Sequence, residues 1–89
     1  MQFKNLSFIT HPVLDGIMSQ VICNNGKRLS VVAGKGTYSS SKDGVRAAVS
    51  EVENVSSFEV MIGAEVLGWQ SREDINNILK ENNKGYENI

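Results

Sequence analysis

The sequence has few of the residues from which small proteins build covalent cross-links, metal centres or catalytic sites. It contains one cysteine (Cys23), one histidine (His11), one proline and one tryptophan among 89 residues. A single cysteine cannot form an internal disulfide, and one cysteine with one histidine cannot supply the ligands of a zinc site. We therefore expect no disulfide framework, no metal and no cofactor.

An excess of basic charge and long apolar runs are also missing. The nine lysines and arginines are scattered and the net charge is −1, whereas nucleic-acid-binding domains carry a basic face. No stretch approaches the roughly 18 apolar residues that a membrane helix needs, and the N-terminus lacks the apolar segment of a signal peptide. The composition argues against nucleic-acid and membrane partners and predicts a cytoplasmic protein.

The sequence does have the composition of one small globular domain. Hydrophobic residues make up 40% and charged residues 21% of the chain, as in ordinary globular proteins. A chain of this length forms one domain, so we treat residues 1–89 as one unit with a frayed tail over about 85–89. Its core is thin, and burial against a second subunit would stabilise it.

The clearest element is a β-hairpin that turns at Asn25-Gly26. The flanking segments 17–23 and 28–33 are rich in Val, Ile and Leu, and Asn-Gly is the strongest short signal for a two-residue type I′ turn. Such a turn places Ile22 opposite Leu29. The predicted core face then carries Met18, Ile22, Leu29, Val31 and Ala33.

The opposite face of this predicted hairpin is also apolar. A second apolar face must be covered by another element or by another subunit. We therefore expect a homodimer or higher homo-oligomer. Trp69 is the sole tryptophan and has either a core role or the role of an interface anchor, which tryptophan often plays. The predicted interface residues are Ile17, Val21, Val32 and Trp69.

Further segments complete an α+β fold. Residues 3–10 and 57–62 have strand character, and a helix begins after Ser71, whose side chain can form a capping box with Asp74. Residues 45–54 show helical spacing, but their β-branched valines leave a strand open as an alternative. The sequence predicts a small antiparallel sheet of three to four strands, with the C-terminal helix packed on it and a second short helix over 45–54.

A small polar loop over residues 34–43 is the best candidate for a ligand site. Backbone N–H groups in a glycine-rich loop can surround an anion, and Lys35 and the serine hydroxyls would add donors. The spacing matches neither a P-loop nor a GxGxxG motif. The loop is a solvated turn, a contact loop for a protein, or a site for a nucleotide or other anion formed by Gly34, Lys35, Gly36, Thr37, Tyr38, Ser39 and Ser40.

No catalytic constellation is recognisable. The sequence names no partner that His11 could activate as a general base. Cys23 lies among branched aliphatic residues, where cysteine acts as a small hydrophobe. We therefore predict that the chain is not an enzyme.

Three segments together carry a family resemblance. They are Leu29-Ser30-Val31 leading to Tyr38-Ser39-Ser40, then Phe58-Glu59-Val60, and then Val66-Leu67-Gly68-Trp69 followed by Ser71 and Glu73-Asp74-Ile75. This order resembles a loose group of small accessory proteins from tailed bacteriophages and prophages, although Ser41 stands where proline is common in that group.

The resemblance implies a phage or prophage protein that acts in the bacterial cytoplasm, and it brings no activity or site residue with it. We expect a non-enzymatic protein-binding module that modulates a host factor. Binding of a nucleotide or other small anion by the 34–43 loop is the alternative.

Overall fold

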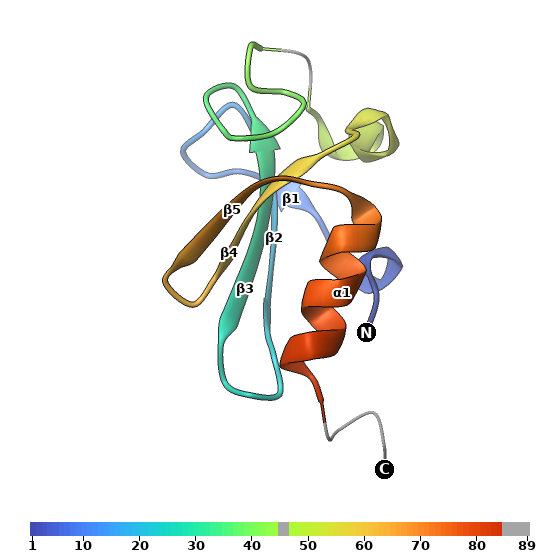
Figure 1. The fold of residues 1–89 in the computed structure, drawn as a ribbon. Coiled ribbons are helices and arrows are strands. Elements are labelled where there is room, and N and C mark those ends of the chain that lie inside the picture. Colours follow the sequence, from blue (N-terminus) through green and yellow to red (C-terminus); the bar gives the residue numbers. More distant parts are fainter. Residues whose placement is uncertain (45–46, 85–89) are drawn as a thin grey trace.

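The computed structural model describes residues 1–44 and 47–84, which form a five-stranded antiparallel sheet and one α-helix (Figure 1). The α+β class and the C-terminal helix are confirmed, but the sheet has five strands instead of three to four. The strands follow one another across the sheet in chain order. The elements are the 3₁₀ helix η1 (Phe3–Asn5), β1 (Ile9–Thr10), β2 (Gly16–Ile22), β3 (Arg28–Gly34), the 3₁₀ helix η2 (Val49–Asn54), β4 (Phe58–Ile62), β5 (Glu65–Gln70) and α1 (Arg72–Asn82).

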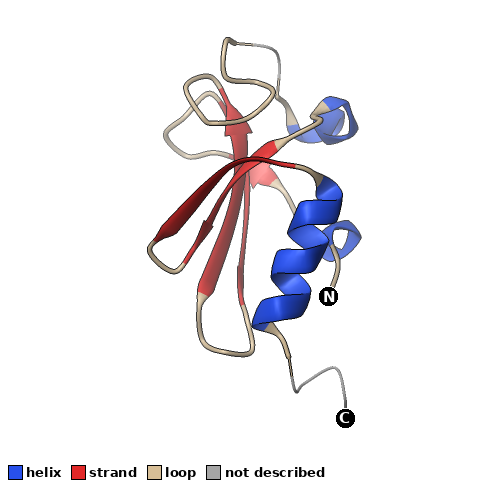
Figure 2. Cartoon of the chain, viewed as in Figure 1, coloured by secondary structure: helices blue, strands red, loops and turns tan. Residues whose placement is uncertain are grey.

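The core lies between one face of the sheet and a layer formed by α1 and the N-terminal segment (Figure 2). Ile75 and Leu79 of α1 are fully buried in it. The rings of Phe3 and Phe8 pack against Phe58, with centroids 5.2 and 5.8 Å away. The buried cluster consists of Ile17, Cys23, Leu29, Val31, Ala33, Val55, Phe58, Val60, Ile62, Ile75 and Leu79.

The β2–β3 hairpin exists, but its turn is one residue longer than predicted. Cys23 N donates to Lys27 O at 2.8 Å, Gly26 N donates to Cys23 O at 2.9 Å, and Gly26 has φ +85°. This is the three-residue loop in which a left-handed glycine forms a G1 bulge. Ile22 therefore pairs with Arg28 and not with Leu29.

A one-residue shift in register moves each side chain of the shifted strand to the other face of a sheet. The faces of β3 are as predicted, but those of β2 are reversed. Ile17 is only 1% exposed and faces α1, whereas Met18 faces away from it. We call the face that α1 does not cover the open face. Its strand residues are Ile9, Met18, Gln20, Ile22, Arg28, Ser30, Val32, Glu59, Met61 and Val66.

The β4–β5 hairpin was not predicted, because no strand was expected between residues 57–62 and the last helix. Ile62 pairs with Glu65, so the turn has two residues, Gly63 and Ala64. Gly63 has φ +59°. A glycine at the first position of a two-residue turn is the requirement of type II′, whose twist suits a hairpin. The expected strand at 57–62 is confirmed as β4.

Two predicted elements are shorter than expected. The predicted strand over 3–10 divides into η1 and the two-residue β1. The segment 45–54, expected as a helix or a strand, contains the 3₁₀ helix η2, which is interrupted at Glu51 by φ −122°. Its β-branched valines restrict rotamers in a helix and favour such short, tight turns. Residues 45 and 46 lie outside the described residues, as does the tail over 85–89.

The start of α1 matches the prediction. The Ser71 hydroxyl accepts from Asp74 N at 3.1 Å, and the Asp74 carboxylate accepts from Ser71 N at 2.9 Å, which completes the capping box. At the other end, Asn25 Nδ2 donates to Asn82 Oδ1 at 2.8 Å and ties the helix to the tip of the β2–β3 hairpin.

Arg72, the first residue of α1, joins the helix to the rest of the domain. Its guanidinium donates to the carbonyl oxygens of Val55 and Val52 at 2.7 and 2.9 Å. It also lies over the rings of Phe3 and Phe58, 5.0 and 5.4 Å from their centroids. One side chain therefore fastens the helix start to the segment before β4 and to the N-terminal aromatic cluster.

Candidate functional site

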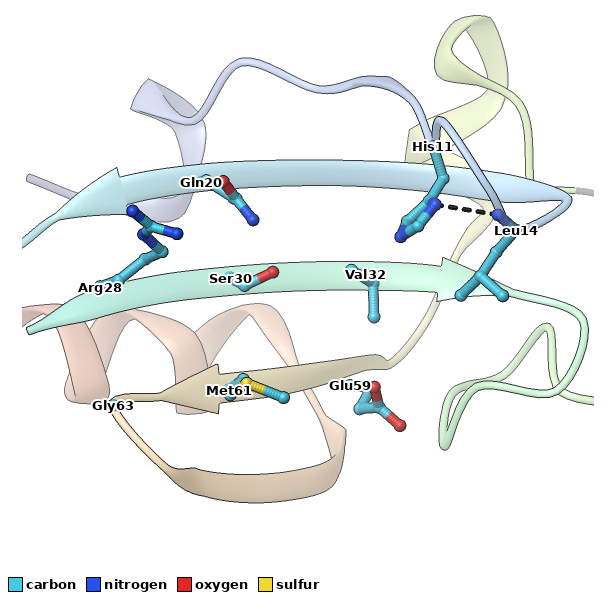
Figure 3. Close-up of a pocket in the computed structure, with 9 residues that line it drawn as sticks. All are labelled: His11, Leu14, Gln20, Arg28, Ser30, Val32, Glu59, Met61 and Gly63. Atoms are coloured by element: carbon cyan, nitrogen blue, oxygen red, sulfur yellow. Dashed lines mark hydrogen bonds between the residues drawn. The ribbon is translucent and has the colours of Figure 1, made fainter.

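The open face is hollowed into a groove of about 310 Å³ that runs along β3 (Figure 3). No helix of the described residues covers it (Figure 2). Ser30 lies at its middle, between Gln20 on β2 and Met61 on β4, to which it is paired across the strands. The groove is lined by His11, Leu14, Gln20, Arg28, Ser30, Val32, Glu59, Met61 and Gly63.

The β1–β2 connection forms the wall at one end of the groove. His11 Nδ1 accepts hydrogen bonds from Val13 N and Leu14 N at 3.0 and 2.9 Å, which folds the turn after Pro12 back on itself. Figure 3 shows the His11 ring and the Leu14 side chain beside Val32, both on the side of the β1–β2 connection. This cover explains why Val32, on the open face, is only 9% exposed.

The two charged residues of the groove lie toward opposite ends (Figure 3). Arg28 begins β3 near the hairpin tip, and its side chain has no hydrogen-bond or ion-pair partner among the described residues. Glu59 pairs with Val32 at the other end, where its carboxylate accepts from Tyr38 N at 3.2 Å. The groove therefore has a positive and a negative end, separated by neutral Ser30 and Gln20.

Apolar side chains border the groove on the open face. Ile22 is 63% and Met61 43% exposed, although both belong to regular strands. Isolated exposed hydrophobic residues are ordinary, but several of them on one uncovered sheet face, with polar residues among them, are typical of a binding surface. The exposed members are Ile9, Leu14, Ile22, Met61 and Val66.

An aromatic pair adjoins the negative end of the groove. Tyr38 and Trp69 have ring centroids 5.4 Å apart and are 49% and 55% exposed. Glu59 opposes both Gly68 and Trp69, so β5 has a bulge at that point, and Trp69 N donates to Tyr38 O at 2.8 Å. Trp69 has φ +49°, the left-handed region that a bulky residue rarely adopts. The bulge thus holds Trp69 on the surface and not in the core.

The predicted ligand loop is turned inward. Each backbone N–H from Gly34 to Lys42 already donates to a partner within the chain. The hydroxyls of Thr37 and Ser39 are buried and bonded to each other at 2.7 Å, and Ser40 Oγ accepts from Ser56 N and Ser57 N. An anion cradle requires free N–H groups, and this loop has none from 34 to 42. Gly34, Lys35, Gly36, Thr37, Tyr38, Ser39 and Ser40 lie together, but in a turn whose N–H groups are bonded to one another's acceptors and to Asp15, Ser57 and Glu59.

The predicted interface residues do not share one surface. Ile17 is buried in the core, and Val21 is half-buried on the same helix-side face. Val32 lies on the open face beneath the β1–β2 connection, and Trp69 is exposed beside Tyr38. The inverted register of β2 accounts for this, because it turns Ile17 and Val21 toward α1 while Val32 on β3 stays on the open face.

The two candidate catalytic residues are far apart. His11 precedes β2 and Cys23 follows it, so about seven residues of strand, or roughly 23 Å, separate them. Cys23 is buried, and burial raises the pKa of its thiol, an effect that a hydrogen bond from Asn83 offsets only in part. A thiol held in the protonated form is a poor nucleophile. Among residues 1–44 and 47–84, no group of three or more His, Cys, Asp or Glu could hold a metal ion.

Sequence reasoning missed the groove residues Leu14, Gln20, Arg28, Glu59 and Met61. The polar residues Gln20 and Ser30 could have indicated the correct register. In the predicted register they lie on opposite faces of the hairpin, whereas in the observed register they pair on one face.

No protein-family model, no curated protein and no solved structure matches this chain. None of the helices in the described part of the chain is long and apolar enough to cross a membrane.

Proposed function

We propose that this chain is a non-enzymatic protein-binding module and that the open face is its binding surface. The observation that carries the proposal is the groove along β3, bordered by exposed Ile9, Ile22, Met61 and Val66 on a sheet face that no described helix covers. Exposed apolar side chains on the uncovered face of a regular sheet, with polar residues among them, are typical of a surface that binds another protein.

The composition of the surface supports a protein partner over a small ligand. Met61 and the aromatic pair Tyr38–Trp69 are residue types enriched at protein interfaces. In the 34–43 loop, which is the alternative ligand site, each backbone N–H from 34 to 42 already donates to an acceptor elsewhere in the chain. These groups are therefore not free to bind an anion. The resemblance to phage and prophage proteins makes a host protein of the bacterial cytoplasm the expected target.

The test compares two variants that gain the same side chain on opposite sides of the domain. Ser30→Arg fills the middle of the groove, whereas Asn77→Arg places arginine on an exposed position of α1. We expect an affinity column of the wild type and of Asn77→Arg to retain the same host protein from a bacterial lysate, and Ser30→Arg to lose it. Equal retention by all three columns, or none by any, would contradict the proposal. Circular dichroism checks that both variants are folded.

A further inference from the structure

We propose that the open face also binds a second copy of this chain, in a symmetric dimer in which Arg28 of each copy pairs with Glu59 of the other. The inference rests on the proposed function, because it uses the same surface. Of the residues that the sequence suggested for self-association, this dimer keeps Val32 on β3, whereas Ile17 and Val21 on β2 face α1.

The charges of the groove are the first observation behind this proposal. In a twofold dimer, a residue i that contacts residue j of the other copy has its own j contacted in return. A surface that joins itself in this way must carry complementary groups at two places. The groove does so, with Arg28 and Glu59 toward opposite ends and Ser30 between them (Figure 3).

The spacing of the strands allows both ion pairs to form. Arg28 and Val32 are four residues apart on β3, or about 13 Å. When two sheets pack face to face with their strands antiparallel across the interface, a half-turn about an axis through Ser30 exchanges the two ends of β3. Arg28 then lies over Val32 of the second copy, and Glu59 is on the adjacent strand, about 4.8 Å to the side. This is within reach of an arginine side chain.

Arg28 and Glu59 cannot satisfy each other within one copy. They are on neighbouring strands, but Arg28 lies opposite Gly63, to which its carbonyl is bonded, while Glu59 lies opposite Val32. Among the described residues, the Arg28 guanidinium has no partner and the Glu59 carboxylate accepts only the Tyr38 N–H. A second copy would supply the missing partner of each.

The size of the sheet predicts a weak dimer. Five strands spaced about 4.8 Å apart and up to seven residues long give a face of roughly 19 by 23 Å, or about 450 Å² per copy. A stable interface buries about 800 Å² per partner. Even with the flanking β1–β2 connection and Trp69 included, the expected dissociation constant is therefore in the micromolar range or above.

The experiment is a charge exchange measured by sedimentation equilibrium over a concentration series. Arg28→Glu puts two glutamates opposite each other at both contacts of the dimer, and Glu59→Arg puts two arginines there. We expect each variant alone to associate at least roughly tenfold more weakly than the wild type.

An equimolar mixture of the two variants restores opposite charges at both contacts. At one contact, the glutamate introduced at position 28 of one chain faces the arginine introduced at position 59 of the other chain. At the second contact, the unchanged Arg28 of one chain faces the unchanged Glu59 of the other. The mixture is therefore expected to form a heterodimer about as strong as the wild-type dimer.

If Arg28 and Glu59 only supported the fold of their own chain, mixing the two variants would not restore association. Restored association in the mixture therefore shows that the two residues meet across the dimer. A wild-type chain that stays monomeric up to millimolar concentration would overturn the dimer, as would a mixture that associates no better than its components. Those results leave the proposed function intact if Ser30→Arg still loses the host protein in the lysate experiment. The converse result is recovered association in the mixture of variants with no host protein retained on any column. That combination would show that the open face serves self-association alone.

Discussion

Replacing Arg72 with alanine is expected to destabilise the domain strongly, although the side chain is only half-buried. Its two hydrogen bonds to the carbonyls of Val52 and Val55 involve a charged donor, and such bonds contribute about 1.5 kcal/mol each at the lower end of their range. Contact with the rings of Phe3 and Phe58 adds about 0.5 kcal/mol. Partial exposure favours these lower values, and the expected loss is about 3.5 kcal/mol.

This loss is large for a domain of 89 residues, whose whole free energy of unfolding is expected to be about 4–13 kcal/mol. Arg72→Lys keeps the charge but loses the fork that reaches both carbonyls, so we expect it to cost about 2 kcal/mol. Urea denaturation followed by circular dichroism gives both values from the transition midpoints.

Arg28→Ala is the matched control, because Arg28 has no partner among the described residues of its own chain. Measured at a concentration low enough to keep the chain monomeric, it should change the free energy of unfolding by less than about 0.5 kcal/mol. If Arg72→Ala also stays within about 0.5 kcal/mol of the wild type, then the bonds to Val52 and Val55 do not join the helix to the domain, and the reasoning is wrong.

Three further predictions concern the bulge, the helix start and the thiol. Gly68→Ala adds a Cβ that would lie 2.9 Å from Tyr38 Cβ, and should destabilise the domain by about 1–3 kcal/mol; a change below about 0.5 kcal/mol would show that the Tyr38 loop yields freely. Ser71→Ala removes the hydroxyl that accepts from Asp74 N and should lower the free energy of unfolding by about 1 kcal/mol. An unchanged midpoint in a thermal melt would show that the cap does not stabilise α1. Because burial raises the pKa of Cys23, a disulfide reagent should react slowly with the folded chain at neutral pH and faster once the pH passes that pKa. The same shift should lower stability at alkaline pH, and rapid labelling of the folded chain at neutral pH would contradict it.

Local patterns in the sequence were sufficient for most elements of the fold. The flanks of the Asn25-Gly26 turn became β2 and β3, and the capping box of Ser71 and Asp74 starts α1 as predicted. These features depend on residues that are neighbours in the chain. The β4–β5 hairpin was missed because Gly63-Ala64 is not one of the strong two-residue turn signals, although Gly63 takes the positive φ of a type II′ turn.

The faces of the sheet were harder to predict, because they depend on one residue in a turn. Gly26 takes a positive φ in either a two-residue or a three-residue loop, so Asn-Gly alone does not choose between them. Both faces of β2 carry apolar residues, and hydrophobicity could not decide either. The open face, the groove and the opposed charges of Arg28 and Glu59 all follow from that register.

The loop from Gly34 to Lys42 has a consequence for the dynamics of the domain. Amide protons exchange with solvent when their hydrogen bonds open, and irregular loops ordinarily exchange fast. Here each N–H from 34 to 42 is bonded within the chain, and Thr37, Ser39 and Ser41 are buried. In hydrogen exchange this connection would behave like part of the sheet. Tyr38 and the Trp69 ring beside it would then be held on a rigid support, ordered before any partner arrives.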